Sequence, residues 1–285
     1  WKSPLAGEAN SSRVVLGGKV YITRSQGEGH RTQLEIVAID RHSGNELWTK
    51  SVGRPVGNTH QRNGFASATV ASDGEHVLAY FGAKGLYCLT TDGDLRWHRP
   101  YTGAIHEWGT ASSPVIAGGM AIQLVESQSE SFLAAYDLAT GDQQWQTPRE
   151  SNGCWTSPVV TSIGSRWHVV VNGSGSSNGL SGSITGYDLA NGQLLWSIEG
   201  TSDIVCPTAA VGQDTIVSAT GASGPVLALD TRQSPPTVKW QLPSGGAYVP
   251  TGVVYRDRVY LVDDDGILRC LNLEDGTSIW KKSLG

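Results

Sequence analysis

The sequence is poor in methionine and phenylalanine. It holds one methionine and three phenylalanines, against 36 glycines and 10 tryptophans, in 285 residues. A glycine-rich chain in which tryptophan is the favoured large aromatic residue suits many short strands joined by tight turns better than it suits packed helices. We therefore expect an all-β protein.

The sequence also lacks any run of Lys and Arg, and its formal net charge is −5. The positive field that holds a phosphate backbone is thus missing, and we predict no nucleic-acid partner. No stretch of about 18 apolar residues occurs, so we expect no membrane-spanning segment. The chain begins at Trp1 without a charged and apolar leader pattern. Removal of a leader or an upstream segment would account for this start, and we predict a periplasmic or secreted location.

Six segments of the chain end alike, at a spacing of about 40 to 50 residues that is typical of propeller blades. They are AIDRHSGNELW (38–48), CLTTDGDLRW (88–97), AYDLATGDQQW (135–145), GYDLANGQLLW (186–196), ALDTRQSPPTVKW (228–240) and CLNLEDGTSIW (270–280). Each ends on one of the repeat tryptophans Trp48, Trp97, Trp145, Trp196, Trp240 and Trp280. We interpret these side chains as packing wedges between adjacent sheets, in preference to an aromatic cage for a ligand.

A glycine stands four residues before five of these tryptophans and follows a polar residue, as in Thr140-Gly141. A polar residue and Gly between two alternating runs predict a tight hairpin. The fifth copy has Gln233-Ser234-Pro235-Pro236 instead, so its hairpin should be looser.

A second hairpin precedes each of these segments, so each repeat predicts four antiparallel strands. One such sheet cannot bury both of its faces alone, and neighbouring copies must stack. The expected fold is a β-propeller of about six four-stranded blades in one domain over residues 1–285, alone or as part of a seven- or eight-bladed ring. The repeats are expected at approximately 11–50, 65–99, 111–147, 155–198, 206–242 and 249–284.

The four cysteines show neither a CxxC pair nor a neighbouring histidine at metal-ligand spacing, so we predict no zinc site. Cys88 and Cys270 occupy the same place in two repeats that are not adjacent, which favours small buried strand residues. Cys154 and Cys206 both precede an inner strand in neighbouring repeats. A disulfide between them is the less favoured alternative.

The repeat pattern of an aliphatic pair, Asp, Gly and Trp, with SSPV at 112–115 and TSPV at 156–159, resembles the pyrroloquinoline-quinone-like repeat family. That family includes quinone-dependent dehydrogenases and the lipoprotein of the outer-membrane β-barrel assembly machinery. The resemblance implies a propeller. It also implies that a quinone would need a disulfide of adjacent cysteines and a calcium site. Adjacent cysteines are lacking, and we interpret Asp263-Asp264-Asp265 as a solvated turn, so we expect neither pyrroloquinoline quinone nor calcium.

Trp1 resembles the tryptophan of a preceding repeat, yet the last repeat already supplies its own tryptophan strand at 279–284. We therefore expect either a six-bladed ring with an accessory first strand or a segment of a larger ring. The second reading predicts a gap, or an irregular contact between the first and last blades, and self-association.

Function is expected at the face that carries the loops between successive blades. The longest of these loops, at 51–67 and 99–112, together with the later equivalent loops, supply the candidate ligand-binding residues. These candidates are His60, Asn63, His106, Glu107, Trp108, Trp155 and Tyr248. One interpretation makes His60 and His106 metal ligands or general bases with Glu107 as their partner. We favour the other, in which the histidines cap loop backbone, and assign no catalytic or metal-binding residue.

Two functions follow from these observations. The favoured one is a non-catalytic binding or scaffold propeller, exported, that engages a protein or a small polar ligand at the loop face. The alternative is a quinone- or metal-dependent oxidoreductase. The Gly/Ser-rich stretch 172–183 is expected to be a flexible loop on the same face.

Overall fold

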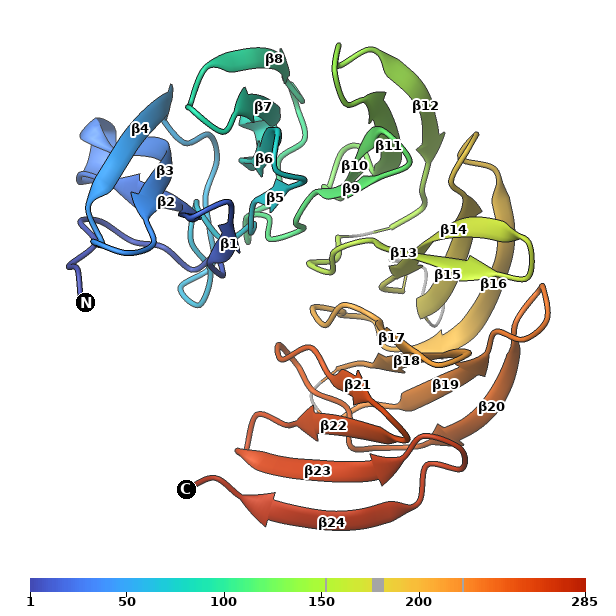
Figure 1. The fold of residues 1–285 in the computed structure, drawn as a ribbon. Helices are drawn as coiled ribbons and strands as arrows, with labels where there is room; N and C mark the ends of the chain where they lie inside the picture. The colour runs from blue at the N-terminus through green and yellow to red at the C-terminus, as the bar shows by residue number, and fades with distance from the viewer. Residues whose placement is uncertain (152, 176–181, 222) are drawn as a thin grey trace. The chain divides into compact units, whose positions relative to one another are not determined.

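The computed structural model describes residues 1–151, 153–175, 182–221 and 223–285, so residues 176–181 of the Gly/Ser-rich stretch 172–183 lie outside the described residues. In the described parts the chain is built from strands and turns. The helical elements there are two single 3₁₀ turns, η1 (Gly29–Arg31) and η2 (Gly82–Lys84) (Figure 1). The chain divides into two compact units, Trp1–Arg149 and Glu150–Gly285, which are described separately.

The first unit consists of three four-stranded antiparallel sheets, each in sequential strand order. The strands are β1 (Val14–Leu16), β2 (Lys19–Gln26), β3 (Gln33–Asp40) and β4 (Glu46–Gly53); β5 (Ala71–Ser72), β6 (His76–Tyr80), β7 (Leu86–Thr90) and β8 (Leu95–Arg99); and β9 (Val115–Ala117), β10 (Met120–Val125), β11 (Phe132–Asp137) and β12 (Gln143–Pro148).

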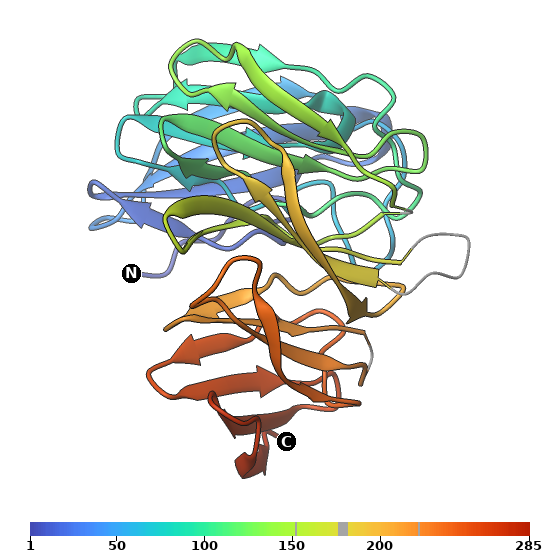
Figure 2. The same ribbon diagram turned by 90° about the vertical axis from the view of Figure 1, so that its right-hand side faces the viewer.

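The second unit repeats this plan (Figure 2). Its strands are β13 (Val159–Ile163), β14 (Arg166–Asn172), β15 (Gly182–Asp188) and β16 (Leu194–Thr201); β17 (Ala210–Gly212), β18 (Thr215–Ala219), β19 (Val226–Asp230) and β20 (Thr237–Leu242); and β21 (Val253–Tyr255), β22 (Arg258–Val262), β23 (Ile267–Asn272) and β24 (Ser278–Ser283).

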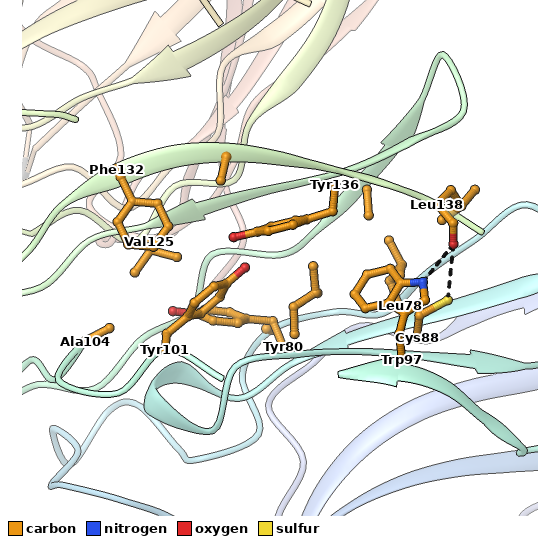
Figure 3. Close-up of a cluster of buried hydrophobic side chains, with 14 residues drawn as sticks. Leu78, Tyr80, Cys88, Trp97, Tyr101, Ala104, Val125, Phe132, Tyr136 and Leu138 are labelled. Carbon is orange, nitrogen blue, oxygen red and sulfur yellow. Dashed lines mark hydrogen bonds between the residues drawn. The ribbon is translucent and has the colours of Figure 1, made fainter. Parts of the chain in front are cut away.

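The core lies between the faces of successive sheets. The two middle strands of the second sheet are buried on both faces, and they are accordingly almost continuously apolar, with HVLAY in β6 and LYCLT in β7. Figure 3 shows the cluster between the second and third sheets, where Tyr80, Tyr101 and Phe132 pack together. The outer strands alternate instead, as β4 does with ELWTKSVG, because only one face of each is buried.

Within the two units, a tryptophan joins the first sheet to the second, the second to the third, and the fifth to the sixth. Trp97 of β8 donates its indole N–H to the backbone carbonyl of Leu138 in the following sheet, at 2.9 Å (Figure 3). Its ring covers Gly141 so closely that a Cβ built there would lie 2.6 Å from the indole. Trp48 makes the same contact with Thr91 and Gly93, and Trp240 with Leu273 and Gly276. The glycine of the repeat therefore serves the neighbouring tryptophan as well as its own turn.

A small residue stands opposite every repeat tryptophan on the paired strand, which leaves room for the indole. The six residues are Ala38, Cys88, Ala135, Gly186, Ala228 and Cys270. This position explains why two cysteines recur at the same place in the repeat. Cys88, Cys206 and Cys270 form no disulfide, and burial raises the pKa of the Cys88 thiol to about 12.

The aspartate of the repeat holds the turn before the glycine. Asp40 accepts the backbone N–H groups of His42 and Ser43 on Oδ1. Asp137 accepts those of Ala139 and Thr140 in the same way. These donors favour the carboxylate, so the hydrogen bond from Ser43 lowers the pKa of Asp40. The pairing register shifts at this point in all six sheets, which aims the tryptophan at the next sheet.

A second joint lies at the inner edge, two residues before each first strand. There a backbone N–H donates to the hydroxyl of the equivalent residue in the next sheet, as from Thr69 to Ser113 Oγ at 3.0 Å. In the first unit these hydrogen bonds run from Ser12 to Thr69 and from Thr69 to Ser113, and in the second they run from Ser157 to Thr208 and from Thr208 to Thr251. Sheets are thus tied at both their inner and outer margins.

The first and last tryptophans differ in what covers them. Trp1 donates its indole N–H to Arg41 O at 2.7 Å and lies over Gly44. It therefore takes, against the first sheet, the position that Trp48 takes against the second. Trp280 is 42% exposed, whereas Trp97, Trp145, Trp196 and Trp240 are each at most 8% exposed.

Trp196 makes a different contact because the fifth repeat lacks the glycine turn. Its indole N–H donates to His168 Nδ1 in its own sheet, at 3.1 Å. Its ring lies over Gly186, where a Cβ would approach it to 2.1 Å. The indole hydrogen bond of Trp196 thus stays inside the fourth sheet, while its ring still packs with Ile216 and Leu229 of the fifth sheet.

Two glycines with nearly the same backbone conformation provide a test of the tryptophan joint. Gly141 has φ +76° and Gly119 has φ +75°, but only Gly141 faces an indole, while nothing lies within 4 Å of a Cβ at Gly119. Gly119→Ala should cost about 1 kcal/mol through the left-handed backbone alone. Gly141→Ala should cost about 1–3 kcal/mol more, because the added methyl collides with Trp97. Urea unfolding of both variants measures the difference. Equal urea midpoints for Gly119→Ala and Gly141→Ala would contradict a stabilising contact between Trp97 and Gly141.

The buried His168 predicts an acid-sensitive second unit. Desolvation lowers the pKa of His168, so the fold favours its neutral form. The stability that neutral His168 gives is fully present above about pH 6.5, its ordinary pKa in the unfolded chain. It is lost as the pH falls from there through the lowered pKa of the folded protein. Unfolding free energies measured from pH 7.5 to 5 should therefore fall less steeply in His168→Gln. The other histidines are present both in the unchanged protein and in His168→Gln, so they do not affect the comparison. Identical slopes of the unfolding free energy against pH in the two proteins would refute the prediction.

Candidate functional site

The two longest loops of the first unit lie against each other. One, 54–70, joins β4 to β5, and the other, 100–114, joins β8 to β9. Asn63 donates from Nδ2 to the carbonyl of Trp108 at 2.8 Å, and the backbone N–H of His60 donates to the same oxygen at 3.2 Å. Gly57 packs on Ile105, whose Cγ2 would lie 2.9 Å from a Cβ at that glycine. The loops therefore brace each other across neighbouring sheets.

Asn63 is the central polar residue of the first loop. Its backbone N–H donates to His60 O at 2.8 Å, and its Oδ1 accepts the backbone N–H of Gly64 at 2.9 Å. Ser67 Oγ also donates to Oδ1. An asparagine side chain satisfies local backbone in this way when regular structure is lacking. Asn63 thus fixes the shape of its own loop and its contact with the second loop at the same time.

Both predicted histidines hold the backbone of their own loops. His60 Nδ1 accepts the N–H of Arg62 at 3.1 Å, and His106 Nδ1 accepts the N–H of Trp108 at 3.1 Å. When neutral, each ring therefore carries its proton on Nε2. The Trp108 ring lies between them, with centroids 6.0 Å from His60 and 5.7 Å from His106. His106 is buried, whereas Glu107 and Trp108 are exposed.

A small pocket, partly open to solvent, lies beside these loops. Its lining comes from β3, both long loops, the η2 turn and the end of β10. Leu34, Phe65, Phe81 and Ile105 supply apolar walls, and Glu126 supplies a carboxylate. Sequence reasoning missed Glu126. The available signal was a charged residue directly after the apolar strand AIQLV of β10.

The remaining candidates, Trp155 and Tyr248, belong to the second unit. The backbone N–H of Trp155 donates to Val205 O at 2.9 Å, and that of Tyr248 donates to Asp264 Oδ2 at 2.8 Å. Both side chains are half-buried. The structure thus brings His60, Asn63, His106 and Trp108 together in the first unit and places these two candidates in the second.

The acidic cluster of the second unit is a turn held by its own backbone. Asp263 Oδ1 accepts the N–H groups of Asp265 and Ile267, and its Oδ2 pairs with Arg269 at 2.9 Å. Within the described ranges, no group of three or more His, Cys, Asp or Glu side chains is placed to hold a metal ion. The same residues contain no helix that is both long and apolar enough to cross a membrane.

Repeated four-stranded sheets joined by tryptophan and glycine define a β-propeller repeat protein. A family model described as "Outer membrane protein assembly factor BamB" matches residues 32–282. The chain therefore belongs to this family of pyrroloquinoline-quinone-like repeat proteins. The expected fold class, an all-β chain of about six four-stranded propeller blades, and the expected family are both confirmed.

Curated relatives carry the same name. The chain is 23% identical over 261 residues to outer membrane protein assembly factor BamB of Yersinia pestis, covering 87% of this chain and 61% of that protein. It is 21% identical over 288 residues to the BamB of Burkholderia pseudomallei, covering 96% and 66%. The chain thus spans less than two thirds of either relative. The crystal structure of BamB from Moraxella catarrhalis shares the fold, with a TM-score of 0.67 and 14% identity over 98% of this chain and 75% of that one.

Proposed function

We propose that this chain is a non-catalytic binding propeller that engages a partner protein through the loop face of the first unit, defined here as residues 54–70 and 100–114. The observation that carries the proposal is a set of exposed apolar side chains on braced loops. Trp108 is 37% exposed, Ile105 40% and Val56 47%. Tryptophan is enriched among the residues that dominate protein interfaces. Loops held in place before binding lose little conformational entropy when a partner arrives.

The names of the relatives support a protein partner in preference to a substrate. Both curated relatives are called outer membrane protein assembly factors, which places them among proteins that act on other proteins. We propose the same class of role here, in an exported location such as the periplasm. The contacts of His60 and His106 favour the same conclusion, because each ring uses Nδ1 to hold its own loop.

A photo-crosslinking residue placed at Glu107 should capture a protein partner in the native host, because Glu107 is exposed on the loop face. The matched control is Ala139, which is also exposed but lies in the β11–β12 turn. Mass spectrometry of the product is expected to identify a component of outer membrane protein assembly at position 107 only. Equal capture at both positions, or none at 107, would contradict the proposed face.

The purified protein should not reduce dyes with alcohols or sugars after addition of pyrroloquinoline quinone and calcium. Adjacent cysteines are lacking in the sequence, and Asp263 is occupied by Arg269 and its own turn. Dye reduction that depends on the added cofactor, measured against a known quinone dehydrogenase, would overturn the non-catalytic proposal.

A further inference from the structure

The carboxylate of Glu126 is buried beside the loop face with one oxygen satisfied and the other not. Its side chain is 1% exposed, and Oε1 accepts a hydrogen bond from Arg149 Nε at 2.7 Å. No described residue donates a hydrogen bond to Oε2. A buried carboxylate oxygen to which no protein group donates is unfavourable. Glu126 Oε2 can therefore still accept a hydrogen bond.

Glu126 is one of the residues that line the pocket described above, on the side of the loop face. The pocket is bordered by Val56 and Ile105 of the two long loops, and both of these side chains are exposed. Ala83 and Gly82 of the η2 turn form another part of the wall. A group that enters would meet apolar side chains along its length and an unpaired acceptor. Such a site suits an apolar stem with a polar tip.

The charges of Glu126 and its partner determine which polar group a bound side chain can carry at its tip. Arg149, whose side chain is 6% exposed, already balances the charge of Glu126. An incoming cation would lose its hydration and meet a pair without net charge. An incoming carboxylate would offer only acceptors to an acceptor. A neutral hydroxyl or carboxamide supplies the missing hydrogen bond without burying a further charge.

We propose that this pocket is an anchor site for one side chain of the bound polypeptide, an uncharged side chain that ends in a hydroxyl or a carboxamide and donates to Glu126 Oε2. The inference rests on the proposed function, because it takes the ligand to be part of a protein that lies on the loop face. It adds the chemistry of the contact, which the exposed residues of the face do not specify.

Four small molecules of matched size test the chemistry on the full chain. Propionamide reproduces a glutamine side chain, and propan-1-ol, propionate and propylammonium differ from it only in the polar group. Propionamide and propan-1-ol should saturably shift the backbone amide signals of Ile105, Gly109 and Thr110, while the two ions should bind at least tenfold more weakly. Equal binding of the ions, or a crystal soaked in propionamide that holds only water at Glu126, would overturn the proposal.

Two alanine variants separate pocket binding from general surface binding. Ala83→Leu fills the pocket from the η2 turn, and Ala139→Leu adds the same bulk at the β11–β12 turn. Ala83→Leu should weaken propionamide binding at least tenfold, whereas Ala139→Leu should leave it unchanged. Amide spectra confirm that both variants fold. Glu126→Gln is a weaker test because it leaves Arg149 buried without its carboxylate. Undiminished binding to Ala83→Leu would refute the site.

A final measurement distinguishes failure of the anchor from failure of the proposed function. The partner captured at Glu107 is added to the labelled chain in the presence of propionamide, and it should abolish the propionamide shifts by occupying the pocket. A partner that binds the loop face and leaves those shifts intact overturns the anchor and keeps the proposed function. Selective binding of propionamide to a chain that captures no partner overturns both the proposed function and the polypeptide source of the ligand.

Discussion

Within each unit a sheet buries its faces against its neighbour, and the indole of a tryptophan connects the first sheet to the second, the second to the third and the fifth to the sixth. The tryptophan needs a small residue across its own sheet, a glycine in the next one and a carbonyl to accept its N–H, as Trp97 finds in Cys88, Gly141 and Leu138. The aspartate turn and the register shift place those three groups. A four-stranded sheet with two apolar faces is not stable alone in water. Folding of a repeat therefore depends on its contact with a neighbouring sheet.

Much of the fold could be predicted because the residues that form the tryptophan joint recur at a fixed spacing in the sequence. The glycine and tryptophan of five repeats lie four positions apart, and that spacing indicated the hairpins and the stacking of sheets. The small residue opposite the tryptophan was visible only as a recurring Cys88 and Cys270. The inner joint from Thr69 to Ser113 escaped prediction, because serine and threonine before a strand have many uses and only the register shows what they contact.

The candidate site could be predicted less completely, for a physical reason. Loop length indicated the right segments, and the structure brings His60, Asn63, His106 and Trp108 together there. Glu126 follows a strand instead, and its significance depends on Arg149 and on the lack of a second donor, neither of which the local sequence reveals. How the first and last blades meet stays a prediction, as does the single domain over residues 1–285.

The contact that Trp196 makes with His168 has a consequence for cooperativity. In a linear repeat array, each element communicates only with the elements beside it, so the coupling energy at every boundary determines how far an opening spreads. Between the fourth and fifth sheets the indole hydrogen bond is missing, whereas the packing of Trp196 on Ile216 and Leu229 and the inner joint from Ser157 to Thr208 are kept. Fluctuations of one blade therefore pass to the next at this boundary through apolar packing and the inner joint, without the outer hydrogen bond.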